Sequence, residues 1–179
     1  MRGTGGQESK WNIGLRYIPD IPVDRAEFRM TVTYAILPGA FLGVEYNPLD
    51  DDVGLLANWR IVDETKSTPM LMVGTSSDRI GTPNGRAYYT TLAKSFRTGT
   101  SISLAPYVGL SYGEFDDEWI GIGGMGVRWM KDLASTSSYD GHNLHHMLDY
   151  TLTPNHRIGF VLAEQGSKHY GGVSLGWTF

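Results

Sequence analysis

The stretch Phe28-Arg29-Met30-Thr31-Val32-Thr33-Tyr34-Ala35-Ile36 alternates large apolar side chains with polar or small ones. A period of two predicts a β-strand with one apolar face, and β-branched and aromatic residues favour the same conformation. The alternation recurs at residues 53–61, 102–111 and 173–179. No window of similar length follows the 3.6-residue period of a helix, and residues 131–138 could form at most a short helical turn. The sequence therefore predicts an all-β protein.

Clusters of turn-forming residues, such as Pro38-Gly39 and Pro83-Asn84-Gly85, separate the alternating segments. They divide the chain into eleven runs at residues 11–18, 27–36, 40–46, 53–61, 69–75, 86–96, 101–112, 119–130, 143–152, 157–164 and 169–179. We expect one up-and-down antiparallel domain over residues 11–179. Residues 1–10 are polar and Gly-rich, and we interpret them as a flexible leader or an artificial start.

The composition excludes several classes of protein. The 179 residues contain no cysteine, which excludes a disulfide scaffold and a Cys-ligated metal site. A net charge of −4 and the absence of a Lys/Arg block argue against a nucleic-acid partner. The longest apolar stretch, residues 35–44, contains Pro38 and is too short for a membrane-spanning helix. We expect neither a cofactor nor a metal.

Charged residues make up only 19% of the chain, whereas glycine occurs 23 times and aromatics reach 12%. The second face of the strands is mostly Gly, Ser, Thr and Ala, which suits a crowded lumen better than a solvated surface. These features predict a transmembrane β-barrel surrounded by the lipids of a bacterial outer membrane. A soluble lipocalin-like barrel that binds an apolar ligand is the alternative, and it would carry its apolar side chains inside.

Bacterial barrels have an even number of strands, short turns on one side and longer loops on the other. The short connections at residues 38–39 and 97–100 and the long ones at 19–26 and 76–85 follow this rule. If short and long connections alternate over eleven runs, Phe179 ends on the side of the long loops instead of the side of the short turns. We therefore expect one run to be missed or falsely split between Gly113 and Asn143. Twelve strands are preferred, with ten as the alternative.

The C-terminal segment, residues 169–179, alternates to its last residue and ends in phenylalanine. It resembles the C-terminal signal strand of bacterial outer-membrane barrels. The residues that carry this resemblance are Gly172, Leu175, Trp177 and Phe179. The resemblance implies that the barrel-assembly machinery is a partner.

A second resemblance covers residues 69–113. Pro69-Met-Leu-Met-Val-Gly74, Asp78-Arg-Ile-Gly-Thr82, Ala93-Lys94 and Tyr107-Val-Gly-Leu-Ser-Tyr-Gly113 occur in that order. This pattern resembles the YjbH-like family of outer-membrane barrels linked to exopolysaccharide production, although Ala93-Lys94 stands where Ser-Lys is usual. The resemblance implies a role in the envelope or in polysaccharide export, with envelope or secretion proteins as partners. It implies no catalytic residues.

Charged residues inside the predicted strands are candidates for the lumen, where they would pair or line a narrow solute path. These candidates are Arg16, Arg29, Glu45, Arg60, Lys94, Arg128 and Glu164. A polar cluster at the rim is predicted from His142, His145, His146 and Asp149.

His145 and Asp149 would share one strand face, and His146 would point to the other. The prediction is a barrel with a structural, interaction or export-associated role and a lumen too narrow for a general open porin. A membrane-embedded lipid-modifying enzyme is an alternative, and it would need a nucleophile or base at the rim, such as His145 or His146.

Overall fold

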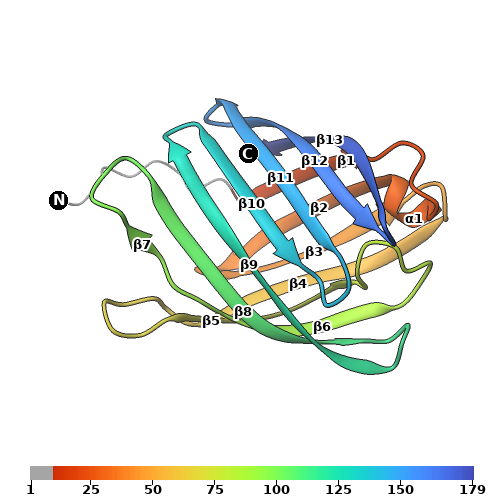
Figure 1. Cartoon of the computed structure of the whole chain (residues 1–179), viewed down its shortest axis with the longest axis horizontal. Helices are drawn as coiled ribbons and strands as arrows, with labels where there is room; N and C mark the ends of the chain where they lie inside the picture. The colour runs from red at the N-terminus through yellow and green to blue at the C-terminus, as the bar shows by residue number, and fades with distance from the viewer. Residues whose placement is uncertain (1–9) are drawn as a thin grey trace.

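The computed structural model describes residues 10–179, which form one antiparallel sheet (Figure 1). Its strands are β1 (Trp11–Tyr17), β2 (Phe28–Leu37), β3 (Ala40–Asn47), β4 (Asp52–Val62), β5 (Met70–Ser77), β6 (Arg86–Ala93), β7 (Phe96–Arg97), β8 (Ser103–Gly113), β9 (Glu118–Met130), β10 (Leu133–Tyr139), β11 (Leu144–Thr153), β12 (His156–Gln165) and β13 (Lys168–Thr178). One short helix, α1 (Asp24–Glu27), lies between β1 and β2. Residues 1–9 of the predicted leader lie outside the described residues.

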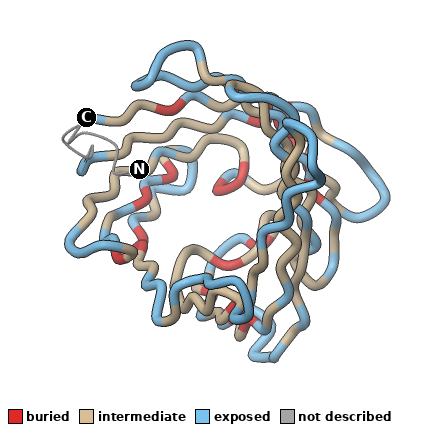
Figure 2. Tube along the Cα trace, turned by 90° about the vertical axis from the view of Figure 1, so that its left-hand side faces the viewer, coloured by how far each residue is buried: buried red, intermediate tan, exposed pale blue. Residues whose placement is uncertain are grey.

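The sheet closes into a barrel because β1 pairs with β13 and β6 pairs with β8. β6 and β7 are two parts of one barrel strand, since both pair with β8 and are separated only by Lys94 and Ser95. The thirteen strands of the sheet therefore make twelve barrel strands, which confirms the preferred count. Figure 2, which looks at the barrel from one end, shows them as a ring.

The additional strand is β10, so residues 133–139, which could have held a short helical turn at most, form a strand. The segment Leu133-Ala-Ser-Thr-Ser-Ser-Tyr139 has no apolar alternation because Ser135 and Ser137 occupy positions that are apolar in the other strands. Pairing to β9 on one side and to β11 on the other nevertheless fixes it as a strand. β10 lies between Gly113 and Asn143, where the alternation of short and long connections predicts one more strand.

The apolar side chains of the barrel lie on its outside. Val53 is 66% exposed and Trp119 is 68% exposed, and most large apolar residues of the strands show the same pattern. Few apolar residues are buried among those described, and most of them form one small cluster of Ile18, Ile21, Ala26, Val161 and Ala163. This inside-out distribution excludes the soluble lipocalin-like barrel, and it is the arrangement of a barrel that faces lipid. Among the described residues, no helix is long and apolar enough to span a membrane.

The two ends of the barrel differ. The end that we name the α1 rim carries α1 and the connections 18–27, 48–51, 78–85, 114–117, 140–143 and 166–167. The opposite end, which we name the terminal rim, carries β1's start, β13's end and the connections 38–39, 63–69, 98–102, 131–132 and 154–155 (Figure 1). Register irregularities in four strand pairs lie near turns of the terminal rim, where bulges are common in barrels.

The β1–β2 connection folds back into the barrel instead of extending away from it. Ile18, Ile21 and Ala26 pack against Val161 and Ala163, which point inward from β12. Burying these apolar side chains anchors the connection without a long helix, because α1 has only four residues. The mouth of the barrel at the α1 rim is therefore lined partly by this segment.

Candidate functional site: an arginine-lined lumen

Two cavities lie inside the barrel, with volumes of about 270 Å³ near the α1 rim and about 230 Å³ farther along the lumen. Arg16 on β1 and Arg29 on β2 line both of them, so the cavities adjoin at these two side chains. The strand pairing explains this, because Arg16 and Arg29 are directly opposite each other in register. Two guanidinium groups thus lie side by side across one strand pair.

Arg29 is neutralised by Glu45 on β3. The Nε of Arg29 donates to Oε2 of Glu45 at 2.8 Å, and the side chain of Glu45 is fully buried. The other carboxylate oxygen of Glu45 accepts a hydrogen bond from the backbone N–H of Ser77 at 2.8 Å. A buried carboxylate held by a guanidinium and a backbone N–H is satisfied on both oxygens, so this pair is structural.

Arg16 has no such partner. Its Nε is buried and makes no hydrogen bond, and no carboxylate lies within salt-bridge distance of Arg16 among residues 10–179. Arg157 on β12, which lines the second cavity with Asp149, likewise forms no salt bridge with any described residue. An unpaired guanidinium facing a cavity is a binding group for anions.

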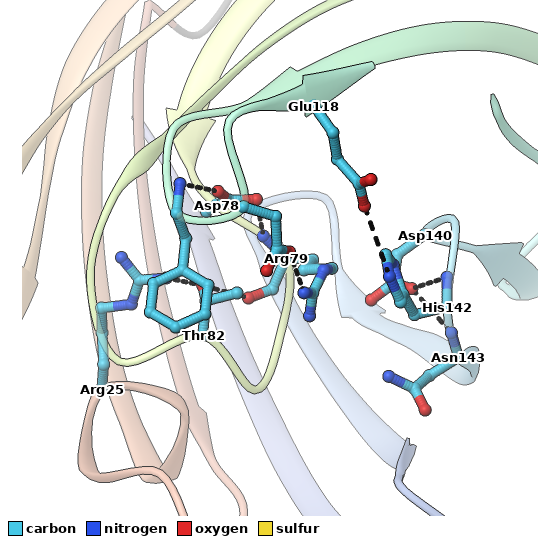
Figure 3. Close-up of polar contacts among 10 residues, drawn as sticks. Arg25, Asp78, Arg79, Thr82, Glu118, Asp140, His142 and Asn143 are labelled. Carbon is cyan, nitrogen blue, oxygen red and sulfur yellow. Dashed lines mark hydrogen bonds and ion pairs between the residues drawn. The ribbon is translucent and has the colours of Figure 1, made fainter. Parts of the chain in front are cut away.

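Arg25 of α1 joins two connections at the α1 rim (Figure 3). Its guanidinium donates to the backbone carbonyl of Gly85 at 2.9 Å and to the hydroxyl of Thr82. The Thr82 hydroxyl in turn donates to the backbone carbonyl of Arg79 at 2.9 Å. Burial lowers the pKa of Arg25 from its ordinary value, and nearby carboxylates, Glu45 first among them, oppose that shift.

Asp78 extends this network to the β8–β9 connection. Its carboxylate accepts hydrogen bonds from the backbone N–H groups of Arg79 at 2.8 Å and of Phe115 at 3.1 Å. The Arg79 side chain forms an ion pair with Asp116 of the same connection. Three connections of the α1 rim, residues 18–27, 78–85 and 114–117, are therefore tied together around the mouth of the first cavity.

The predicted rim cluster does not form one site. His145 points into the lumen and contacts Asp140 through Nε2 at 2.8 Å, and it lines the first cavity. Asp149 points inward from the same strand and lines the second cavity. His142 lies 3.6 Å from Glu118 across the α1 rim (Figure 3). His146 faces outward, where its Nδ1 is 2.8 Å from the Ser137 hydroxyl.

Asp140, in the β10–β11 connection, organises the lumen side of this region. Burial raises the pKa of its carboxyl, but hydrogen bonds from His145 and from the backbone N–H groups of Asn143 and His142 outweigh burial and hold the pKa below its ordinary value. Asp140 is therefore a stable anion beside the arginines of the lumen.

The remaining lumen candidates lie at the rims or outside. Arg60 pairs with Asp63 near the terminal rim at 2.6 Å, and Lys94 donates to backbone carbonyls of the β4–β5 connection, including that of Lys66 at 3.0 Å. Arg128 is exposed near the end of β9 and lines neither lumen cavity.

The lumen prediction is wrong for Glu164. Its neighbour Ala163 is buried inside the barrel, so Glu164 points to the other face of β12. The prediction failed because residues 157–164 carry charges on both faces, and parity alone did not say which face is inner.

Several lumen residues were not predicted, namely Arg25, Asp78, Thr82, Asp140 and Arg157. Asp78 and Thr82 were visible as part of the Asp78-Arg-Ile-Gly-Thr82 turn, but nothing in the sequence shows that this turn meets Arg25. Arg157 alternates with Ile158 at the start of β12 and could have been assigned to the lumen by the same parity as Arg16.

Asp116, Glu118 and His142 are the described residues that bring three possible metal-ligand atoms together, all within 4.8 Å of one another. All three side chains are exposed, and Asp116 is already ion-paired with Arg79. The group is explained as a set of rim ion pairs.

The C-terminal segment completes the barrel. Gly172, Leu175 and Trp177 lie in β13, which pairs with β1 and β12. The backbone N–H of Phe179 donates to the carbonyl of Trp11 at 2.9 Å, and the Trp11 N–H donates back at 3.1 Å. The end of the chain is thus a closing strand, and its role as an assembly signal stays a prediction.

The comparisons with known proteins bear on the fold. The chain matches no protein-family model and none of the curated proteins. The crystal structure of the Acinetobacter baumannii outer membrane protein Omp33 is similar over 98% of this chain and 100% of that chain, with a TM-score of 0.55 and 12% identity. The NanC porin is similar over 94% of this chain and 98% of that chain, with a TM-score of 0.50 and 12% identity. At this identity the likeness shows that the fold is that of outer-membrane β-barrels.

Proposed function

We propose that the protein is a bacterial outer-membrane barrel whose narrow, arginine-lined lumen carries small anionic solutes. The observation that carries this proposal is Arg16, whose unpaired guanidinium lies where the two cavities adjoin. Rings of arginine or lysine are the usual lining of pores that select anions.

The balance of charge along the cavities supports the proposal. Their linings contain five arginines and three aspartates, and two of the arginines, Arg29 and Arg79, are paired with Glu45 and Asp116. The arginines are Arg16, Arg25, Arg29, Arg79 and Arg157, and the aspartates are Asp78, Asp140 and Asp149. Asp78 is occupied by backbone N–H groups, and Asp140 by His145 and backbone N–H groups. Arg16 and Arg157, which form no salt bridge with any described residue, are therefore the guanidinium groups left to meet an anion in the cavities.

The size of the cavities limits the solute. Their volumes of about 270 and 230 Å³ are below the roughly 300–1,000 Å³ that encloses a drug-sized ligand. A small carboxylate or phosphate fits this space, and planar guanidinium groups bind both in a bidentate manner. The geometry favours a selective path and argues against a general open porin.

Location and partners form part of the same proposal. The apolar outer surface and the fold support insertion among outer-membrane lipids, and the C-terminal strand supports recognition by the barrel-assembly machinery. An envelope or exopolysaccharide-export role, with envelope or secretion proteins as partners, rests on the resemblance of residues 69–113. The narrow cavities favour a small solute over a polymer chain, so we rank the export role second.

Liposome swelling tests the proposal. We expect vesicles containing the folded protein to take up a small sugar acid faster than a neutral sugar of similar size. Arg16→Gln should remove most of that preference, because it deletes the unpaired guanidinium between the cavities. The matched control is Arg60→Gln, which alters an exposed arginine of the terminal rim that pairs with Asp63. Equal uptake of both sugars by the unaltered protein would contradict the proposal.

A further inference from the structure

A serine and a histidine form a hydrogen-bonded pair on the outer surface of the barrel. Ser137 on β10 and His146 on β11 are directly opposite each other in register, with Ser137 Oγ 2.8 Å from His146 Nδ1. Their neighbours Ser138 and His145 line the lumen cavity. Because successive side chains of a strand alternate, Ser137 and His146 point toward lipid.

This position is unusual for such residues. The other outward positions of β11 are Leu144, Leu148, Tyr150 and Leu152, all exposed and apolar in character. An ionisable side chain on a lipid-facing surface is costly, and it is treated as a functional group by default. The lumen function proposed above makes no use of this pair.

The pair opens onto a hollow of about 240 Å³ in the outer surface. Ser135, Ser137 and His146 supply its polar part, and Leu148, Phe160 and Leu162 supply its apolar part. Phe160 is 53% exposed and Leu148 is 45% exposed, so the apolar walls are open to the membrane. A hollow lined by both polar and apolar side chains matches the junction between an ester group and its acyl chain.

A carboxylate lies on the next strand of the same face. Leu162 of β12 is directly opposite His146, and Glu164 is two residues further toward the α1 rim. Diagonal neighbours of this kind are within reach of long side chains. In this structure one carboxylate oxygen of Glu164 accepts from the backbone N–H of Leu144 at 2.9 Å, and no hydrogen bond joins Glu164 to His146 among the described residues. Serine, histidine and glutamate thus lie on three adjacent strands.

We propose that this surface is a hydrolytic site for ester-linked fatty acyl chains of membrane lipids. Ser137 Oγ attacks the ester carbonyl carbon while its proton passes to His146 Nδ1. The carbon–oxygen bond of the ester breaks, and the leaving alcohol takes the proton from His146. Water then attacks the acyl-serine, gives a proton to His146 and releases the fatty acid, and Ser137 regains its proton. Glu164 acts as a positioning residue for the imidazole once its carboxylate leaves the Leu144 N–H.

Ser135 is placed to stabilise the oxyanion of this reaction. Its Oγ accepts a hydrogen bond from Trp129 Nε1 at 2.9 Å, so its own hydroxyl proton can be donated within the hollow. A donor directed at the developing negative charge is the group that acyl transfer requires besides nucleophile and base.

The depth of the site fits the substrate. Tyr139, an exposed aromatic residue, ends β10 at the α1 rim, and Ser137 is two residues from it, or about 7 Å along the strand. Aromatic residues at the ends of barrel strands mark the membrane interface. Ser137 thus lies just below the interface, where acyl ester groups are found. The two longest connections of the barrel, residues 18–27 and 78–85, lie at the α1 rim, which places this rim on the outer side of the membrane and makes the substrates outer-leaflet lipids.

The test uses the full chain folded in detergent and in vesicles. A fluorophosphonate probe reports a reactive serine, and release of fatty acid is measured with glycerophospholipid vesicles and, separately, with lipopolysaccharide. The variants are Ser137→Ala, His146→Ala and Glu164→Gln. The control is Ser138→Ala, which removes the adjacent serine that faces the lumen, and heat-modifiable migration on a gel confirms that each variant is folded.

We expect the probe to label the unaltered protein and Ser138→Ala but not Ser137→Ala. His146→Ala should lower labelling and fatty-acid release by roughly 10²–10⁴-fold, the usual contribution of a general base. Glu164→Gln should retain the labelled serine but lower the rate and alter its pH profile. Release from only one of the two lipids identifies the source of the acyl chain. A folded, unaltered protein that takes no probe and releases no fatty acid from either lipid would overturn the proposal, whatever the outcome for the lumen.

Discussion

At the scale of single residues, the same side chains act differently according to which strand face they occupy. His145 and His146 are neighbours in the sequence, yet His145 binds Asp140 inside the barrel and His146 binds Ser137 outside it. The paired arginines show the same principle across strands. Arg29 is neutralised by Glu45, whereas Arg16 opposite it is left to face the cavities.

Asp140 provides a pH-dependent prediction. Its pKa in the folded protein lies below the ordinary value of 3.8, so the carboxylate stabilises the fold above that value. This contribution is lost as the pH falls through the folded pKa, that is, below about pH 4. Asp140→Asn should cost about 1 kcal/mol of unfolding free energy at neutral pH, because hydrogen bonds to a charged group are stronger.

The measurement is urea unfolding of the detergent-folded barrel at several pH values, with Asp63→Asn as the matched control at an exposed position. We expect the difference between Asp140→Asn and the unaltered protein to shrink toward zero as the pH falls below about 4. A difference that is constant across the whole pH range would contradict this account.

At the scale of elements, the connection between β1 and β2 stands out. It folds into the mouth of the barrel through Ile18, Ile21 and Ala26, and Arg25 ties it to residues 78–85. The sequence predicts a long connection at residues 19–26, but its inward course has no sequence signal. A helix of four residues, such as α1, is too short to give a periodic pattern in the sequence. The cluster that buries the connection includes both Ala26 and Val161, which are 135 residues apart, so no local pattern could predict it.

Arg25→Ala tests the role of this connection. The change leaves the buried Thr82 hydroxyl and the Gly85 carbonyl without their donor, which should cost about 1–3 kcal/mol locally. We expect the connection to detach and the single-channel conductance in a planar bilayer to rise. Arg79→Ala, which removes the ion pair with Asp116 at the cavity mouth but leaves the hydrogen bonds of Arg25 in place, is the comparison at the same rim. Unchanged conductance in Arg25→Ala would show that the connection does not restrict the lumen.

At the scale of the whole molecule, an inside-out distribution of polarity determines the architecture. Eleven of the strand segments could be predicted because large apolar side chains alternate with small or polar ones, as at residues 28–36. The remaining strand, β10, has no apolar alternation because its outward positions Ser135 and Ser137 are polar. The alternation of short and long connections shows only that one more strand is needed in this part of the chain. The two serines that hid the strand belong to the proposed lipid-facing site.

The site itself was less predictable than the fold. The alternation of side chains along a strand places Arg16 and Arg29 on the face away from lipid. It cannot show that Glu45 neutralises Arg29 and leaves Arg16 unpaired. That distinction depends on the register of three strands and on side-chain reach. The function proposed for the lumen therefore rests on the three-dimensional arrangement more than on any motif.

The central claim is an anion-selective path through the barrel, and the reversal potential across a planar bilayer tests it most directly. With the folded protein inserted and a potassium chloride gradient applied, the account predicts a reversal potential of the sign that chloride selectivity gives, reduced in Arg16→Gln. A reversal potential of the opposite sign, or no conductance from correctly folded and inserted protein, would contradict it.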